Sequence, residues 1–148
     1  MTSTLNPYIS FSDTAREALD FYQSVFGGDI VRSTFGDMNP NEDPADADKI
    51  MHSQLTTPSG FTLMASDTPA TMQYTPGNNI SVSLSGFAPD SAELTGFWHA
   101  LTEGATITAP LNVAPWGDTF GMLIDRFGIN WLVNISAAPA APAAPAAA

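Results

Sequence analysis

The chain has 148 residues, 44% of them hydrophobic, so it can bury one good core but hardly two. Its formal net charge is −11, with 15 acidic residues against 4 basic ones, which argues against nucleic acid or an anionic membrane as a partner. The absence of cysteine excludes disulfides and thiolate chemistry, and no apolar run approaches membrane-spanning length. Because the N-terminus also lacks the basic flank and apolar stretch of a signal peptide, we expect a cytoplasmic protein.

The first half of the chain predicts one strand, one amphipathic helix and three further strands. An extended segment at 6–11 precedes a helix at 14–26, in which apolar residues recur at intervals of three or four: Ala15, Ala18, Leu19, Tyr22 and Phe26. Thr14 and Glu17 have the spacing of a capping box, and Gly27 follows the last apolar position. Extended runs at 30–35, 50–56 and 61–66 complete this half.

The segment 36–49 interrupts these strands with five acidic residues and two prolines. Its carboxylates do not have the spacing of a calcium-binding EF-hand loop, and the glycine and terminal glutamate of that loop are missing. We therefore expect a solvent-exposed loop.

The second half repeats the order of the first. An extended segment at 79–85 precedes a helix at 91–103, capped by Asp90 or Ser91 and followed by Gly104, with an apolar stripe of Leu94, Phe97, Trp98 and Leu101. His99 lies off that stripe and is expected in solvent. Extended runs follow at 105–109, 120–124 and 131–135, and the last is preceded by a tight turn at 125–128.

A β-α-β-β-β unit used twice predicts an α+β fold. We expect one domain over 1–136, made of a first module at about 5–70 and a second at about 78–136. After Ser136 the composition changes to Ala and Pro alone, which predicts a mobile tail of partly polyproline-II character at 137–148.

Alternation along the strands separates a helix-packed face from a second face, on which hydroxyl and amide groups predominate. The side predicted to pack on the helices includes Ile9, Phe11, Met51, Leu55, Ile80, Val82, Leu84, Trp131 and Val133. The second side includes Tyr8, His52, Gln54, Met64, Asn79, Leu132 and Asn134. Such a surface either lines a ligand-binding cup or is the wetted side of an antiparallel sheet, and the pattern alone leaves both open.

Six segments, in their order along the chain, resemble the PhnB-like branch of the vicinal oxygen chelate superfamily, which includes glyoxalase I, bleomycin-resistance proteins and extradiol dioxygenases. They are Asn-Pro-Tyr-Ile-Ser-Phe at 6–11, Ala-Arg-Glu-Ala-Leu-Asp-Phe-Tyr at 15–22, Phe-Gly-Gly at 26–28, Met-His-Ser-Gln-Leu at 51–55, Trp-Gly-Asp-x-Phe-Gly at 116–121 and Asp-Arg-Phe-Gly-x-x-Trp-x-x-Asn at 125–134. The resemblance covers about residues 5–136. It implies paired modules whose curled mixed sheets surround a cleft, the glyoxalase/bleomycin-resistance fold, usually within a homodimer.

In the metal-dependent members, the resemblance implies ligands on the first and last strand of each module. The corresponding residues here are Tyr8, Met64, Asn79 and Leu132, with Asn134 as a one-step alternative. Because Met and Leu supply no hard donor, we expect no metal cofactor. The alternative is one divalent ion, such as zinc, nickel, manganese or iron, held by a non-standard set that includes His52 with Asp118 or Asp67, in a lyase, isomerase or dioxygenase.

The leading hypothesis is therefore a metal-free protein that binds an unidentified small molecule. The candidate ligand-binding residues are Tyr8, His52, Gln54, Met64, Asn79, Trp116, Phe120, Leu132 and Asn134. His52 is a weak candidate for a general base, because imidazole titrates near neutrality; the alternatives are a ligand contact and a hydrogen-bonding residue between strands. Trp116 either forms a wall of the cleft or covers the end of the sheet core.

Two activities suggested by names used for this branch fit the sequence poorly. A phosphonate substrate would need a basic cradle or a metal, whereas the four basic residues are scattered along the chain. Transfer of a methyl group to a ubiquinone precursor would normally need a nucleotide-binding unit with a glycine-rich turn, and no G-x-G-x-x-G pattern occurs.

Overall fold

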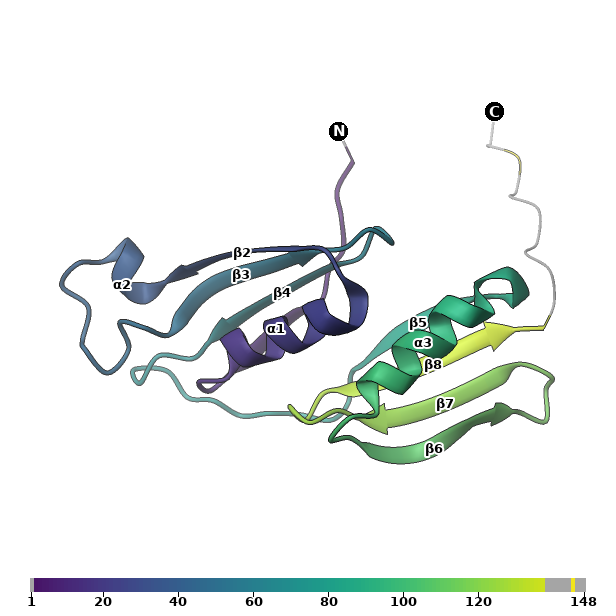
Figure 1. Cartoon of the computed structure of the whole chain (residues 1–148). Coiled ribbons are helices and arrows are strands. Elements are labelled where there is room, and N and C mark those ends of the chain that lie inside the picture. The colour runs from purple at the N-terminus through teal and green to yellow at the C-terminus, as the bar shows by residue number, and fades with distance from the viewer. Residues whose placement is uncertain (1, 138–144, 146–148) are drawn as a thin grey trace. The chain divides into compact units, whose positions relative to one another are not determined.

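The computed structural model describes residues 2–137 and 145, which form two compact units, Met1–Gly77 and Asn78–Ala148 (Figure 1). Each unit is a four-stranded mixed sheet with one long helix, and neither sheet closes into a barrel. The predicted α+β fold of two β-α-β-β-β modules is thus confirmed. The tail predicted at 137–148 lies outside the described residues except for Ala137 and Pro145. Among the helices described, none is long and apolar enough to cross a membrane.

The first unit contains β1 (Tyr8–Phe11), α1 (Ala15–Phe26), β2 (Asp29–Thr34), the short α2 (Phe35–Met38), β3 (Ile50–Thr56) and β4 (Thr62–Asp67). The strand order is β1-β4-β3-β2, with β1 parallel to β4 and the other pairs antiparallel. Helix α1 lies along one face of this sheet (Figure 1). All five residues of its predicted apolar stripe are buried, which leaves the opposite face of the sheet without a helix.

The N-terminus of α1 is capped differently from the prediction. Thr14 makes no side-chain capping hydrogen bond. Instead, the backbone N–H of Ala15 donates to Asp67 Oδ1 at 2.9 Å, and the N–H of Ile50 donates to Asp67 Oδ2 at 2.8 Å. The carboxylate, only 5% exposed, satisfies one of the free N–H groups of the helix and joins α1, β3 and β4. The capping-box prediction was wrong because the acceptor comes from a residue 52 positions away.

The loop between β2 and β3 is more ordered than predicted. Phe35 begins α2 instead of ending a strand, and Thr34 and Asp37 form a capping box around that helical turn. Asp46 is buried, at 4% exposure, with Oδ1 3.0 Å from Lys49 Nζ and Oδ2 accepting the N–H of Ala70. The hydrogen bond from Lys49 is the main cause of a lowered pKa at Asp46. The predicted exposed loop is thus confirmed for most of the segment, and the buried Asp46 is the exception.

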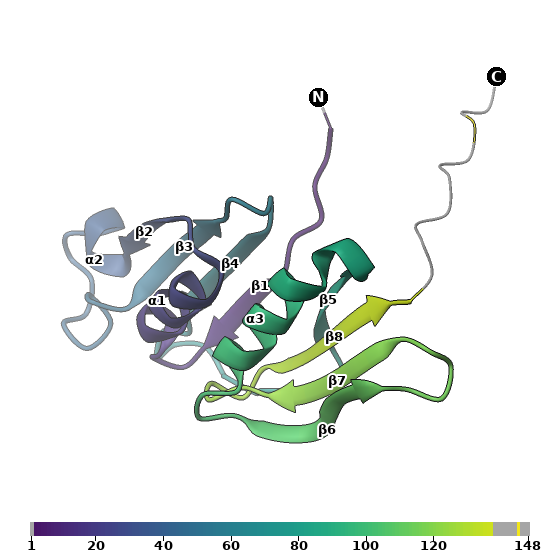
Figure 2. The same cartoon turned by 45° about the vertical axis from the view of Figure 1, so that its right-hand side comes forward.

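The second unit contains β5 (Ser81–Phe87), the 3-10 turn η1 (Ala88–Asp90), α3 (Ser91–Leu101), β6 (Thr106–Val113), β7 (Thr119–Ile124) and β8 (Asn130–Ser136). The strand order is β5-β8-β7-β6, with β5 parallel to β8. Helix α3 covers one face of this sheet (Figure 2). Its predicted stripe is buried and His99 is exposed, so both expectations are confirmed.

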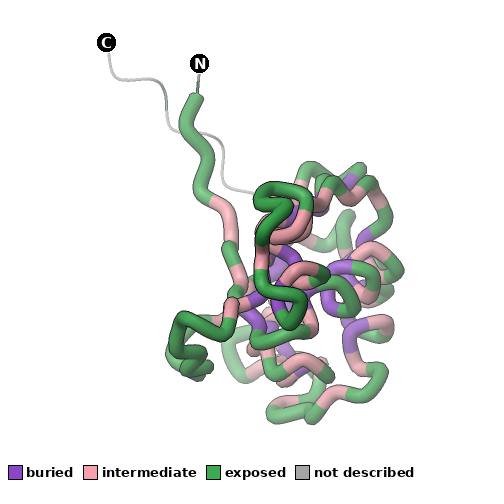
Figure 3. The backbone as a smooth tube through the Cα atoms, turned by 90° about the vertical axis from the view of Figure 1, so that its left-hand side faces the viewer, coloured by how far each residue is buried: buried purple, intermediate pink, exposed green. Residues whose placement is uncertain are grey.

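The strand β6 extends four residues beyond its predicted end, through Pro110. It lies at the edge of the sheet, and its pairing with β7 is irregular between Ala109 and Asn112. An edge strand tolerates proline because one side of its backbone needs no partner. Elsewhere, buried stretches of backbone alternate with half-buried and exposed ones (Figure 3), as expected for sheets covered on one face.

The predicted turn before β8 is confirmed. The N–H of Gly128 donates to the carbonyl of Asp125 at 3.0 Å, and Gly128 has a positive φ of 85°. The buried Asp125 carboxylate also accepts Trp131 Nε1–H at 2.9 Å, so the turn is tied to the core by the ring that follows it.

Candidate functional site

One candidate surface is the helix-free side of the first sheet. Tyr8 pairs with Met64, Met64 with Gln54 and Gln54 with Val31, so these four residues form one row across β1, β4, β3 and β2. Residues paired in register project on the same side of a sheet, and His52, two residues before Gln54, projects there too. We call the surface formed by Tyr8, Val31, His52, Gln54 and Met64 the first sheet face.

The centre of the first sheet face is a contact between two rings. Tyr8 Oη lies 3.2 Å from His52 Nδ1, and the rings stack with centroids 5.7 Å apart and an angle of 30°. Tyr8 is 50% exposed, and His52 is half-buried. When the phenol donates to Nδ1, the neutral imidazole carries its proton on Nε2. The pair then offers one N–H donor, the phenol oxygen and a flat aromatic surface to a ligand.

The face of β3 opposite His52 differs in detail from the prediction. Ile50 pairs with Thr34 and His52 with Ser33, which leaves Met51 in a bulge, half-buried. The buried residue before Leu55 is Ser53, whose hydroxyl donates to the carbonyl of Ala65 at 2.8 Å. The extra residue of a bulge shifts the alternation of a strand, which sequence periodicity alone does not reveal.

A corresponding surface exists in the second unit, on the side of the sheet away from α3. Phe120 pairs with Asn134, and Met122 with Leu132, which pairs in turn with Ser83. We call the surface formed by Ser83, Phe120, Met122, Leu132 and Asn134 the second sheet face. Its members are half-buried apart from the exposed Ser83.

Asn79 does not belong to the second sheet face. It is exposed and lies before β5, which begins two residues later than predicted, at Ser81. Ser83 pairs with Leu132 in the second sheet, just as Tyr8 pairs with Met64 in the first. The error arose because Ile80, 79% exposed, continues the apolar alternation of the strand without being part of it.

Trp116 and Asp118 lie in the loop between β6 and β7, at one end of the second sheet face. Trp116 is 65% exposed and meets Phe120 edge to face, with ring centroids 5.8 Å apart. This exposure contradicts the alternative in which Trp116 covers the core. Asp118 accepts hydrogen bonds from Asn134 Nδ2 at 3.0 Å, Ser136 Oγ at 3.3 Å and the N–H of Ala137 at 3.1 Å. The first of these bonds is the main reason why the pKa of Asp118 is lowered.

The comparisons with known proteins agree with this architecture. A family model described as 3-demethylubiquinone-9 3-methyltransferase matches residues 3–134. The chain belongs to this family. Protein PA1353 from Pseudomonas aeruginosa is 36% identical, with a TM-score of 0.80, over 93% of this chain and all of that one.

Two further structures are more distant. A putative 3-demethylubiquinone-9 3-methyltransferase, PhnB protein, from Bacillus cereus is 24% identical, with a TM-score of 0.71, over 90% of this chain and all of that one. A glyoxylase/bleomycin resistance protein/dioxygenase domain from Frankia is 16% identical, with a TM-score of 0.58, over 91% and 92% of the two chains. This 3-demethylubiquinone-9 3-methyltransferase family member therefore has the glyoxalase/bleomycin-resistance fold, and the predicted PhnB-like relationship is confirmed.

The residues of this family member do not fit the superfamily's metal site. The paired positions on the first and last strands are occupied by Tyr8 and Met64 in one unit and by Ser83 and Leu132 in the other, without an imidazole or carboxylate. His52 and Asp67 project from opposite sides of the first sheet, so they cannot share an ion. Within residues 2–137 and 145, no three His, Asp or Glu side chains are grouped so as to hold a metal ion.

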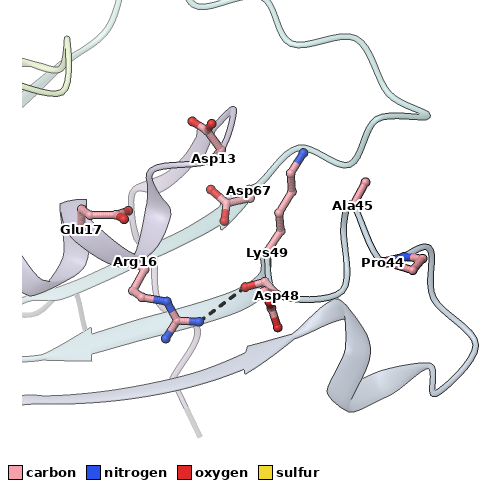
Figure 4. A pocket seen from close by; sticks show the side chains of 8 residues that line it. All are labelled: Asp13, Arg16, Glu17, Pro44, Ala45, Asp48, Lys49 and Asp67. Atoms are coloured by element: carbon pink, nitrogen blue, oxygen red, sulfur yellow. Dashed lines mark hydrogen bonds between the residues drawn. The ribbon is translucent and has the colours of Figure 1, made fainter.

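The structure also contains a pocket that sequence reasoning missed. It has a volume of about 260 Å³ and is lined by Asp13, Arg16, Glu17, Pro44, Ala45, Asp48, Lys49 and Asp67 (Figure 4). Arg16 Nη2 donates to the carbonyl of Asp48 at 3.4 Å across it. The hydrogen bond from Arg16 thus joins α1 to the 36–49 loop at this pocket. No local pattern predicts it because its residues come from three separate segments.

In each unit, basic side chains are engaged away from the sheet face of that unit. Arg32 forms an ion pair with Asp20 of α1, and Lys49 one with Asp46. Arg126 pairs with Glu103 at 3.0 Å and also donates to the carbonyl of that residue. An anionic ligand on either face would therefore find hydroxyl, amide and imidazole groups but no lysine or arginine from the residues that form it.

Proposed function

We propose that this protein binds a small organic molecule on the helix-free faces of its sheets, without the metal ion used by metal-dependent members of the superfamily. The observation that supports this most is the Tyr8–His52 pair, half-exposed on the first sheet face. Two aromatic side chains held against each other by a hydrogen bond lose little conformational freedom when a ligand binds. Contact with water alone does not explain why two aromatic side chains are paired on an exposed sheet surface.

The groups on the first sheet face indicate the chemistry of the ligand. Met64 and Val31 offer apolar contact, and the Tyr8–His52 pair offers an aromatic surface with one hydrogen-bond donor. Gln54 can both donate and accept, although its Nε2 already donates to Thr56 Oγ1 at 3.2 Å. These groups suit a flat, partly apolar molecule with a few polar atoms. In this proposal His52 is a ligand contact, and a role as general base stays a prediction.

A thermal-shift screen of flat heteroaromatic compounds tests the proposal. A ligand that binds the native state raises its melting temperature in proportion to occupancy. The shift should shrink strongly in His52→Ala and partly in Tyr8→Phe, which removes only the hydroxyl. His99→Ala is the matched control because His99 is exposed on α3. Equal shifts in all three variants would place binding elsewhere and refute the proposal.

The metal-free part of the proposal has its own test. Protein purified without chelators or a metal-affinity tag should contain far less than one equivalent of zinc, nickel, manganese or iron. Adding these ions should leave the melting temperature unchanged. A near-stoichiometric metal, with a thermal shift that His52→Ala abolishes, would favour the alternative of a metal-dependent lyase, isomerase or dioxygenase.

We also propose, by analogy with the fold, that the protein is a homodimer in the cytoplasm. Large apolar side chains are exposed in both units, including Val31, Ile80 and Val113. Burial of such side chains between two copies would be favourable. Light scattering should give twice the mass of the chain, 15.6 kDa, and fractionation of the source cells tests the location. A clean monomer would refute the dimer.

A further inference from the structure

At one corner of the second sheet face, the exposed ring of Trp116 and the half-buried ring of Phe120 lie near the carboxylate of Asp118. Trp116 is 65% exposed, and its ring meets Phe120 edge to face. Asp118 lies between Trp116 and Phe120 in the chain. It accepts a hydrogen bond from Asn134, which pairs with Phe120 across β7 and β8. We call Trp116, Asp118 and Phe120 the aromatic corner.

The carboxylate of Asp118 carries a negative charge that its partners do not neutralise. Its donors among the described residues are Asn134, Ser136, the Ala137 backbone and the side chain of Trp116, and all of these groups are neutral. These hydrogen bonds, led by that from Asn134, lower the pKa of Asp118, so the group is ionised near neutral pH. These donors hold the carboxylate beside the Trp116 indole without neutralising its charge.

We propose that the aromatic corner selects organic cations, so that the ligand carries an ammonium or another positively charged nitrogen beside a flat apolar group. This inference rests on the proposed small-molecule binding and adds the charge of the ligand to it. The occupant is a small organic cation, not an anion or a second protein.

Two physical effects favour a cation at this place. The face of an indole ring attracts a cation through its quadrupole, and this contact is stronger than the equivalent one with phenylalanine. The nearby carboxylate adds direct attraction, which is effective at short range even when salt screens the solution. The net charge of −11 raises the local concentration of cations around the whole chain.

The same features disfavour anions. In the second unit, the basic side chain of Arg126 is paired with Glu103, and none of the residues that form the aromatic corner is basic, so these residues offer no cationic partner to a phosphonate or carboxylate. An anion placed there would meet the Asp118 charge without compensation. A neutral ligand would gain the apolar contact but neither the cation–π contact nor the attraction to the Asp118 carboxylate.

A set of three probes with one ring system separates these cases. They are N-methylquinolinium, which is cationic, quinoline, which is neutral near pH 7, and quinoline-2-carboxylate, which is anionic. Each is titrated into protein with 15N-labelled tryptophan, and the indole N–H signals are followed by NMR. Trp98 and Trp131 are buried and serve as internal references, whereas Trp116 should respond.

We expect the cation to shift the Trp116 signal saturably, with an affinity roughly fivefold above that of quinoline, and the carboxylate to bind least. Asp118→Asn keeps the shape of the side chain and should reduce the preference for the cation roughly threefold. Asp48→Asn, a charge removed from the exposed loop of the other unit, should leave the preference unchanged.

The outcomes separate the two proposals. Equal affinity for quinoline and N-methylquinolinium at Trp116 would overturn the cation inference and leave small-molecule binding standing. Equal loss of preference in Asp118→Asn and Asp48→Asn would also overturn it, because net charge alone would then be the cause. If no probe shifts Trp116 while ligands still stabilise the protein through His52, the aromatic corner is not part of the site.

Discussion

Removal of the Asp67 carboxylate should cost the first unit far more stability than removal of the predicted capping residue. In Asp67→Ala, the N–H groups of Ala15 and Ile50 lose their partner. A hydrogen bond to a charged group contributes about 1.5–3 kcal/mol when it is buried. Loss of the negative charge at the N-terminus of α1 adds about 0.5 kcal/mol. We therefore expect the free energy of unfolding to fall by about 3.5–6.5 kcal/mol.

Two matched variants sharpen this prediction. Thr14→Ala should cost less than about 0.5 kcal/mol, because Thr14 makes no capping hydrogen bond. Asp67→Asn keeps one acceptor oxygen but turns an amide N–H2 toward a backbone N–H, so it should cost about half as much as Asp67→Ala.

Urea unfolding followed by far-UV circular dichroism is the appropriate assay, because the three tryptophans, Trp98, Trp116 and Trp131, all lie in the second unit. Their fluorescence reports that unit alone. With a slope of about 2 kcal/mol/M, the expected loss lowers the midpoint of the first unit by about 2–3 M. If Thr14→Ala costs as much as Asp67→Ala, or if Asp67→Ala costs under about 0.5 kcal/mol, Asp67 is not the cap of α1.

Two further predictions concern the second unit. Gly121→Ala should destabilise it by about 1–3 kcal/mol, since the added Cβ would lie 2.8 Å from the Trp98 ring. The control is Gly96→Ala on α3, where the added Cβ meets open space, and this variant should be neutral or stabilising by about 0.5–1 kcal/mol. Equal losses of stability in both variants would contradict the close packing of Gly121 against Trp98. Asp118 has a lowered pKa, so its contribution to stability is present above pH 4 and is lost as the pH falls through its folded pKa. Melting temperatures between pH 6 and 3 should therefore fall less steeply in Asp118→Asn than in wild type, and identical profiles would contradict the hydrogen bonding to Asn134.

The helices were predictable from the sequence because their information is local. The apolar stripes of α1 and α3 recur every three or four residues, and the structure buries every member. The repeated order of elements was equally visible, because each module must bury one helix stripe on one sheet face. The α+β fold of two β-α-β-β-β modules was therefore predictable from these patterns.

Errors occurred where a distant residue decides the local structure. The cap of α1 comes from Asp67, and the buried position of Asp46 depends on Lys49 and Ala70. No periodicity encodes such partners. The bulge at Met51 and the late start of β5 are of the same kind, because pairing with another strand sets them.

The candidate site was predicted in part. Sequence alternation grouped Tyr8 with Met64 and Leu132 with Asn134, and the strand register agrees. The hydrogen bond between Tyr8 and His52 was not predicted, since the two residues are 44 positions apart. Asp118 was considered only as a possible metal ligand. Its hydrogen bond with Asn134 is not predictable from the sequence, because it depends on the end of β8 lying beside the β6–β7 loop.

The most direct test of the metal-free binding proposal is NMR of protein labelled with 13C-methyl methionine, titrated with a stabilising compound from the thermal-shift screen. Met64 and Met122 lie on the two sheet faces, whereas Met38 and Met72 are exposed elsewhere, at 62% and 65%. The account predicts saturable shifts of Met64, of Met122 or of both, without added metal and with Met38 and Met72 unchanged. Shifts confined to Met38 and Met72, or shifts that require a divalent metal, would contradict it.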